Sequence, residues 1–381
     1  TVKTSTFTAV AGEGYFVNTT GGVVSVNLPA GTAGDVVAIK DYANTFDSNA
    51  VTLVQNGSDK IGGSAVNAVL STEGLAVTLV FVDSTQGWLV TDNGTQDTAP
   101  TTRFITATGG TITCSGNFRI HTFTGPGALC VSCAGNPSGS TTVDYLVVAS
   151  GGGGGSGLGG GGGAGGFRTN FPSSCSGIPV SVQPYPIAVG SGGAAGIPDG
   201  GSGTPGNNST FSSITSTAGG GAVARSSPTP VGPGGSGGGG SGLAAYPGGT
   251  GNTPPTSPPQ GNDGGDGSSG TKRSGGGGGG AAGDGGDALS ATYAVGGVGS
   301  SNSITGSAIF YAGGGGGNGD PGGPAPSGLG GNGGGGNGGP STNGTAGAAN
   351  TGGGGGGGAG SCSNGAAGGS GIVIIRYKFQ N

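Results

Sequence analysis

The sequence predicts a mostly β protein with polyproline-II structure: an N-terminal antiparallel β-sandwich-like domain, then a β-base that carries a layered, glycine-rich polyglycine-II sandwich. Three observations support this prediction. Short apolar runs separated by turn residues fill the N-terminal quarter of the chain. Pure glycine runs dominate the part that follows residue 150. Two strongly apolar segments, residues 143–149 and 371–379, bracket those runs.

Residues 1–98 form the predicted N-terminal β-domain. Short apolar runs alternate there with turn clusters such as residues 30–34 and 56–59. Strands that recur at such short intervals are typical of a small antiparallel sandwich or barrel-like domain. The expected strands are residues 23–28, 36–39, 51–54, 76–82 and 88–90, and the expected core residues are Val77, Leu79, Phe81 and Trp88.

Residues 99–150 are predicted to hold the end of a linker and then the β-base. The segment 91–102 is rich in Thr, Asp, Asn and Pro, a composition typical of a linker. Residues 371–381 are expected to close the base, because a flexible tail would not need an apolar return strand. The other strands of the base are expected at residues 104–108, 118–123, 128–132 and 143–149.

Residues 151–370 form the predicted glycine-rich sandwich, which holds most of the 104 glycines of the 381-residue chain. Glycine has no side chain to bury and loses the most backbone freedom on ordering, so hydrogen bonds between strands must replace an apolar core. A collagen-like helix requires a strict Gly-X-Y period, which the glycine runs do not follow. These runs are residues 151–155, 159–163, 275–280, 313–317 and 352–358.

Charge and hydropathy exclude several classes of partner. Charged residues make up 7% of the chain and the formal net charge is −5, so we expect no basic surface for nucleic acid. No run approaches the roughly eighteen apolar residues of a spanning helix, and the first residues lack a signal-peptide pattern. We therefore expect a soluble protein that does not insert into membranes.

Catalytic, cofactor and metal chemistry have little support in the sequence. His121 is the single histidine, and no Ser-His-Asp or Cys-His set can be assembled around it. Cys130 and Cys133 form one C-x-x-C without a second pair, a pattern that fits strand and turn positions better than a zinc site. We expect no enzymatic activity, no cofactor and no metal. Calcium-binding repeats are not in register around Asp263, Asp266, Asp284 and Asp287.

The five cysteines form an odd set, so at least one is unpaired within a monomer. A bridge between Cys175 and Cys362 would join the two ends of the glycine-rich region, and the sequence leaves this pairing open.

Several phrases resemble phage proteins. Residues 123–127 (F-T-G-P-G), 143–150 (V-D-Y-L-V-V-A-S) and 371–377 (G-I-V-I-I-R-Y) resemble the glycine-rich domains of bacteriophage tail-fibre and other phage structural proteins. Residues 12–92, with G-Y-F-V-N at 14–18 and A-G-D-V-V-A-I-K-D at 33–41, resemble a β-module of cyanophage fibre proteins. Together the two similarities cover nearly the whole chain.

This resemblance implies a virion appendage, in which loops on a rigid glycine-rich scaffold bind a host-surface glycan or outer-membrane protein. It also implies a homotrimer whose N-terminal domain contacts other virion proteins. Aromatic and arginine side chains in the islands between glycine runs offer stacking faces and forked donors for such contacts. The candidate receptor-binding residues are Arg225, Tyr246, Arg168, Phe171 and Tyr293, of which Tyr293 could instead pack in a hydrophobic lid with residues 309–311.

Three other interpretations remain open at this point. A capsid-attached fibre or decoration protein could use the glycine-rich region as a passive spacer. An ice-binding protein could present one flat face of a polyproline-II bundle, although these runs contain little Thr. A disordered glycine-rich linker would need no fixed structure at all.

Overall fold

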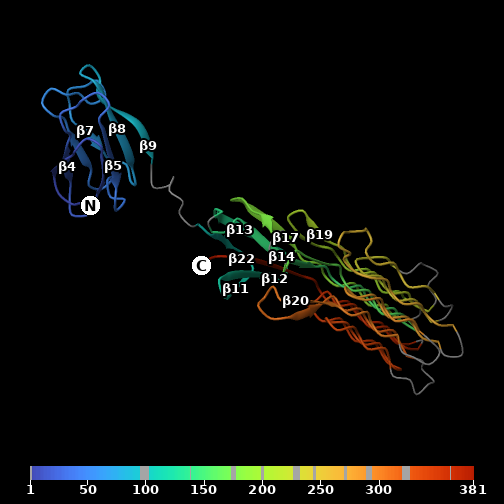
Figure 1. Cartoon of the computed structure of the whole chain (residues 1–381). Coiled ribbons are helices and arrows are strands. Elements are labelled where there is room, and N and C mark those ends of the chain that lie inside the picture. The colour runs from blue at the N-terminus through green and yellow to red at the C-terminus, as the bar shows by residue number, and fades with distance from the viewer. Residues whose placement is uncertain are drawn as a thin grey trace. The chain divides into compact units, whose positions relative to one another are not determined.

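The computed structural model describes residues 2–94, 103–137, 139–172, 177–198, 201–225, 232–242, 246–269, 273–288, 294–319, 327–360 and 362–381. The chain divides into two compact units, Thr1–Thr101 and Thr102–Asn381. Strands, turns and extended segments make up the described part, which confirms the mostly β fold (Figure 1). Nowhere in that part is there a helix long and apolar enough to cross a bilayer.

The N-terminal unit consists of two sheets with the strand orders β1-β3-β5-β8-β9 and β2-β4-β6-β7. From β1 to β6 the chain enters the two sheets in turn. The strands are β1 (Val2–Lys3), β2 (Phe7–Thr8), β3 (Glu13–Val17), β4 (Val24–Asn27), β5 (Val36–Asp41), β6 (Val51–Val54), β7 (Ala68–Leu70), β8 (Ala76–Asp83) and β9 (Gly87–Gly94).

The strand directions in this unit correct part of the antiparallel arrangement expected from the sequence; the pairs β5–β8, β8–β9 and β6–β7 are antiparallel as expected. β1, β3 and β5 pair in parallel, as do β2, β4 and β6. Since the chain crosses to the other sheet after each of these strands, it returns to the same sheet in the same direction. Short intervals between strands along the sequence are compatible with both this crossing path and hairpins, so they do not determine whether neighbouring strands are parallel or antiparallel. β9 also extends to Gly94, into the expected linker, whose residues 95–102 lie outside the described part.

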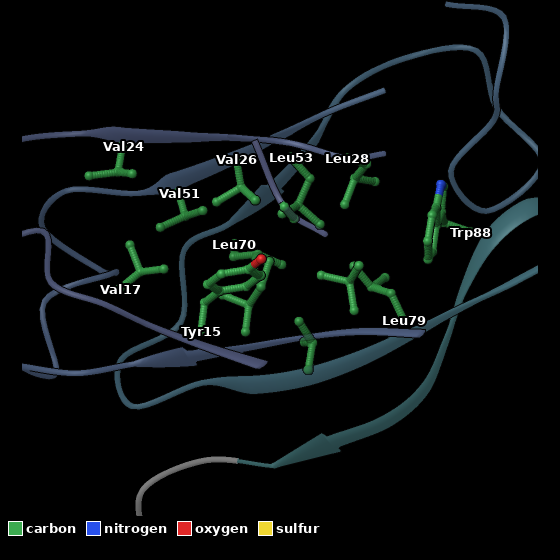
Figure 2. Packing of buried hydrophobic residues seen from close by; sticks show 14 of the residues in the cluster. Tyr15, Val17, Val24, Val26, Leu28, Val51, Leu53, Leu70, Leu79 and Trp88 are labelled. Atoms are coloured by element: carbon green, nitrogen blue, oxygen red, sulfur yellow. The ribbon is translucent and has the colours of Figure 1, made fainter. Parts of the chain in front are cut away.

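The core of the N-terminal unit lies between its two sheets. Alternate residues of β4 and β6 point inward, as the two-residue period of a strand requires. Figure 2 shows side chains from both sheets filling one layer, and the T-shaped ring pair of Phe81 and Trp88 has centroids 5.5 Å apart. The predicted core residues Val77, Leu79, Phe81 and Trp88 are all buried.

The second unit begins with a β-base of two main sheets, ordered β10-β13-β17-β18-β19 and β11-β12-β22-β14-β15. The central pair, β14 and β22, is antiparallel from Asp144 opposite Arg376 to Val148 opposite Ile372. The two apolar segments that bracket the glycine runs therefore pair directly. The base strands are β10 (Ile105–Thr108), β11 (Thr111–Ser115), β12 (Phe118–Phe123), β13 (Gly127–Ala134), β14 (Thr142–Val148), β15 (Phe167–Thr169), β16 (Ile178–Pro179), β17 (Pro184–Ala188), β18 (Ser209–Phe211), β19 (Ile214–Ser216) and β22 (Ile372–Lys378).

The remaining strands, β20 (Ser300–Asn302) and β21 (Ile309–Tyr311), form a hairpin between two glycine-rich segments. Tyr311 is buried in an apolar cluster together with Ile304 and residues of β14 and β22. Ile309 and Phe310 are 43% exposed, so the hairpin buries its tyrosine and leaves its two other large side chains partly open to solvent.

The glycine runs form a lattice in which hydrogen bonds follow a three-residue period. In residues 159–164, each N–H donates in rotation to one of three neighbouring segments, and each C=O accepts in rotation from three others. A disordered linker would leave these groups to water. The donors reach residues 220–223, 276–279 and 355–358, and the acceptors face residues 152–155, 236–239 and 315–318. This threefold pattern is that of packed polyglycine-II strands, which run side by side away from the base (Figure 1).

The interior of the lattice leaves room for hydrogen only at many glycine positions, and very small side chains such as that of Ala164 are buried at others. A Cβ added at Gly160, Gly161 or Gly162 would lie less than 3.0 Å from a carbonyl oxygen of a different neighbouring strand each time. The hydrogen that occupies this position in glycine therefore points at that oxygen, in the geometry of a Cα–H···O contact. At these interior positions any side chain would collide with a neighbouring strand, so only glycine fits.

Strands at the lattice surface use side-chain oxygens to complete their hydrogen bonding. The carboxylate of Asp266 accepts from Gly248 N (2.8 Å), and that of Asp287 accepts from Asp266 N (2.8 Å). Asp263 and Asp284 repeat this pattern three residues earlier on the same two strands. The aspartates that resemble calcium ligands in the sequence thus satisfy N–H groups that would otherwise face solvent.

Replacement of Gly161 by Ala tests the lattice. We expect Gly161→Ala to destabilise the second unit by about 2–3 kcal/mol, because the methyl group would overlap Gly315 O. Calorimetry of the full chain should show the corresponding melting transition lowered by about 5–10 °C. Gly125→Ala is the control, since a Cβ there meets nothing within 4 Å. Equal shifts in the two variants would contradict the lattice.

Candidate functional site

The connections between glycine strands gather at two ends of the second unit. One end is the β-base. At the other end, hydrogen bonds join residues from distant parts of the chain: Arg225 N donates to Ser156 O (3.4 Å), and Gly242 N donates to Leu158 O (3.0 Å). We call this end the distal face and define it by Leu158, Ile197, Arg225, Gly242, Tyr246, Gly319, Gly339 and Ser363.

Leu158 anchors the distal face. It connects two pure glycine runs, is only 5% exposed, and has a φ of 64°, which is unusual for a residue with a side chain. Its carbonyl oxygen accepts hydrogen bonds from Gly242 N and from Ser241 Oγ (3.4 Å). A residue held in this sparsely populated conformation is fixed by its surroundings, so the turn is a rigid part of the surface.

Two of the predicted receptor-contact residues lie at this end. The Cβ of Arg225 packs near Gly157, and the carbonyl oxygen of Tyr246 accepts from Gly267 N (3.0 Å). Both side chains are half-buried. Ile197, which the sequence analysis did not select, is 68% exposed in a neighbouring turn. Tyr293 lies outside the described residues.

Arg168 and Phe171 lie at the base and do not join the distal face. Arg168 pairs with Val147 on β14 and donates from Nη1 to Thr215 O (3.2 Å). Since Val147 and Ser156 are nine residues apart on one extended stretch, Arg168 and Arg225 are separated by about 28 Å. Aromatic and arginine side chains therefore occur at both ends of the second unit, and their sequence context does not reveal at which end each lies.

His121 and the cysteines take structural positions in the base. His121 is buried, with Nδ1 2.7 Å from Gly109 O and Nε2 3.0 Å from the hydroxyl of Tyr377. Cys114, Cys130, Cys133 and Cys362 are free thiols, and Cys175 lies outside the described residues. In the described ranges, no three His, Cys, Asp or Glu side chains are grouped to hold a metal ion.

One signal for the distal face was present in the sequence. Leu158 is a single large apolar residue between two pure glycine runs, where a flexible tract would have no use for it. Ile197 stands in a similar small-residue context. Large apolar residues isolated in glycine tracts therefore indicate turns of the lattice. A search limited to aromatic and arginine side chains does not select Leu158 or Ile197.

The family of the chain is clear from a comparison with known domains. A family model described as "Glycine-rich domain" matches residues 132–378, more than half of the chain, so the chain belongs to this family. The match begins in β13 and ends at the last residue of β22. It therefore includes the central strand pair of the base and all of the glycine runs.

A second similarity concerns a shorter segment. Over 79 residues the chain is 39% identical to the baseplate wedge protein gp10 of Enterobacteria phage T4. This segment is 20% of the present chain and 13% of the T4 protein. Together with the family match, it indicates a phage-related protein.

The environment of His121 predicts a pH dependence of stability. Burial lowers the pKa of His121, and the nearby charge of Arg119 adds to this effect, while the hydrogen bond to Gly109 O opposes it. An unfolded histidine titrates at about 6.5. The stability from a neutral His121 is fully present above that pH and is lost as pH falls towards the lower folded pKa.

We expect the free energy of unfolding to decrease between about pH 7 and pH 5, and to do so less in His121→Gln. Denaturant unfolding of both proteins across this range measures the difference. The comparison is needed because burial raises the pKa of Asp144, which acts in the opposite direction. Identical pH profiles for the two proteins would show that His121 is not buried in its neutral form.

Proposed function

We propose that the protein is a structural component of a phage virion, a tail fibre or adhesin of the cyanophage-like kind, that binds the host surface through its distal face. The observation that carries this proposal is the convergence of turns from distant segments at one end of a scaffold with a hydrogen-bonded interior. Loops on a rigid scaffold are preorganised and lose little entropy on binding. Changes in these turns also leave the interior of the lattice untouched.

The chemistry of the distal face favours a polar surface ligand such as a host glycan or an outer-membrane protein. Arg225 offers a forked set of donors, while Tyr246 offers a ring and a hydroxyl. Ile197 adds an exposed apolar contact. A few contacts of this size are weak individually, and a homotrimer or several copies on one particle would combine them into strong attachment.

The N-terminal unit is proposed to contact other virion proteins. It is compact and has its own apolar core. The partial similarity to a baseplate wedge protein supports a place on the tail. No step of this function requires bond breaking, so we propose a binding protein and not an enzyme. Localisation of the chain by cryo-electron microscopy of the particle would separate attachment to the tail from attachment to the capsid.

Substitutions on the two ends of the second unit test the proposal. We expect the double variant Arg225→Ala, Tyr246→Ala to bind candidate host cells about tenfold more weakly than the unchanged full chain, because it removes both large polar contacts of the distal face. Binding of fluorescently labelled protein to cells measures this effect. Arg168→Ala is the matched control at the base, with an expected change of less than about twofold. Equal binding by all three proteins would favour a passive spacer.

A further inference from the structure

A second candidate site lies in the β-base, at the opposite end from the distal face. It is a cavity of about 470 Å³, within the range of pockets that hold small molecules. Strands β12, β14 and β22 contribute to its wall together with Pro137 and Pro172. The residues that the argument uses are Phe118, Thr142, Asp144, Phe171, Arg376 and Lys378.

Arg376 is the central residue of this cavity. Its guanidinium lies over the ring of Phe118 at 3.8 Å and over the ring of Phe171 at 4.7 Å. Its Nε atom is buried and has no hydrogen-bond partner. The Nε of Arg119 is also buried without a partner, but Arg119 is not among the cavity-lining residues, so only the unsatisfied donor of Arg376 belongs to a cavity that could hold a ligand.

The aromatic rings restrict how a ligand can approach Arg376. Where rings cover its faces, a guanidinium remains open along its edge, and that edge presents parallel N–H donors that match a carboxylate. Lys378 also lines the cavity, with its Nζ donating to Asn381 Oδ1 (2.8 Å), so the site has two cationic side chains and one carboxylate, that of Asp144. The excess of positive charge favours an anionic ligand.

The other lining residues determine which kind of anion fits the cavity. Thr142 and Asp144 can bond to hydroxyl groups, and the phenylalanine and proline residues supply apolar surface. Inorganic anions such as phosphate have no apolar face to set against these rings. A sugar ring with one carboxylate and several hydroxyls combines all three features.

We propose that the cavity of the β-base binds a sugar acid, with its carboxylate at the edge of Arg376 and its hydroxyls towards Thr142 and Asp144. The positive charge of Lys378 attracts the ligand's carboxylate, and the proposal does not require the two groups to be in direct contact. The site is independent of host binding by the distal face, because the two lie at opposite ends of the glycine lattice. Either can therefore fail without the other.

Calorimetric titration of the full chain with D-glucuronate tests the site, with D-glucose and acetate as control ligands. We expect measurable binding of D-glucuronate and at least about tenfold weaker binding of either control, since each lacks one half of the recognised chemistry. Binding of acetate or D-glucose as tight as that of D-glucuronate would overturn the proposal. So would the absence of D-glucuronate binding to the folded protein.

Variants locate the binding in the cavity. Arg376→Gln should weaken D-glucuronate binding by about tenfold or more, and Lys378→Gln by about two- to threefold, since loss of a direct charged contact costs more than loss of a nearby charge. Lys378→Gln, near the end of β22, keeps the test valid if Arg376→Gln does not fold. The matched control is Arg119→Gln, because Arg119 also lies over an aromatic ring, that of Phe379 at 4.7 Å, and is not among the cavity-lining residues. Equal effects of Arg119→Gln and Lys378→Gln would overturn the assignment.

A final titration distinguishes the source of the sugar acid. An oligosaccharide that ends in glucuronate should bind at least as tightly as the monosaccharide if the cavity takes the end of a surface polysaccharide. Binding of the monosaccharide alone would assign the cavity to free sugar acids, and both results support the site.

Discussion

The hydrogen bond between neighbouring main chains is the interaction on which the second unit depends. Ordering the backbone of one residue costs about 1–2 kcal/mol, and one N–H···O bond returns only about 0.5–1.5 kcal/mol. The Cα–H···O contacts of the glycine lattice add about 0.5–1 kcal/mol each. The entropy cost and these stabilising contributions are comparable only when a residue is surrounded on all sides. This explains why pure glycine runs such as residues 159–163 occupy fully surrounded positions.

A lattice of this kind needs a boundary that fixes its register, because glycine strands have no side chains to distinguish one alignment from the next. The β-base supplies this boundary. β14 and β22 pair through buried apolar residues and lead directly into glycine strands. At the junction, the buried hydroxyl of Ser150 donates to Ser191 O (2.7 Å) and accepts from Asn207 N (2.7 Å). The Ser150 side chain thus satisfies main-chain groups at the point where the two-residue period of the β-strand ends and the three-residue hydrogen-bonding period of the lattice begins.

The same construction separates the stabilising interior from the two candidate sites. The interior accepts only glycine or very small residues, while the turns at its ends are free to carry larger side chains. The distal face and the cavity around Arg376 are consequently built from different segments at opposite ends. For a phage-related protein of the glycine-rich domain family, this separation allows the turns to change while the scaffold stays the same.

The sequence by itself determined the local features. The apolar runs at residues 51–54 and 118–123 coincide with β6 and β12, because alternating or continuous apolar residues specify a strand without help from distant partners. Pure glycine runs likewise specified main-chain packing. β11 escaped prediction because its Thr, Cys and Ser side chains are mostly exposed at the edge of a sheet.

Only the tertiary structure decided how these elements are arranged. The parallel pairing of β3 with β5, the separation of Arg168 from Arg225 and the placement of Phe171 over Arg376 all depend on contacts between segments far apart in the chain. Glycine strands offer nearly identical hydrogen-bonding groups to every neighbour, so no local pattern records which strand lies beside which. The order of the strands, and with it the make-up of both candidate sites, follows from the closed packing of the whole unit.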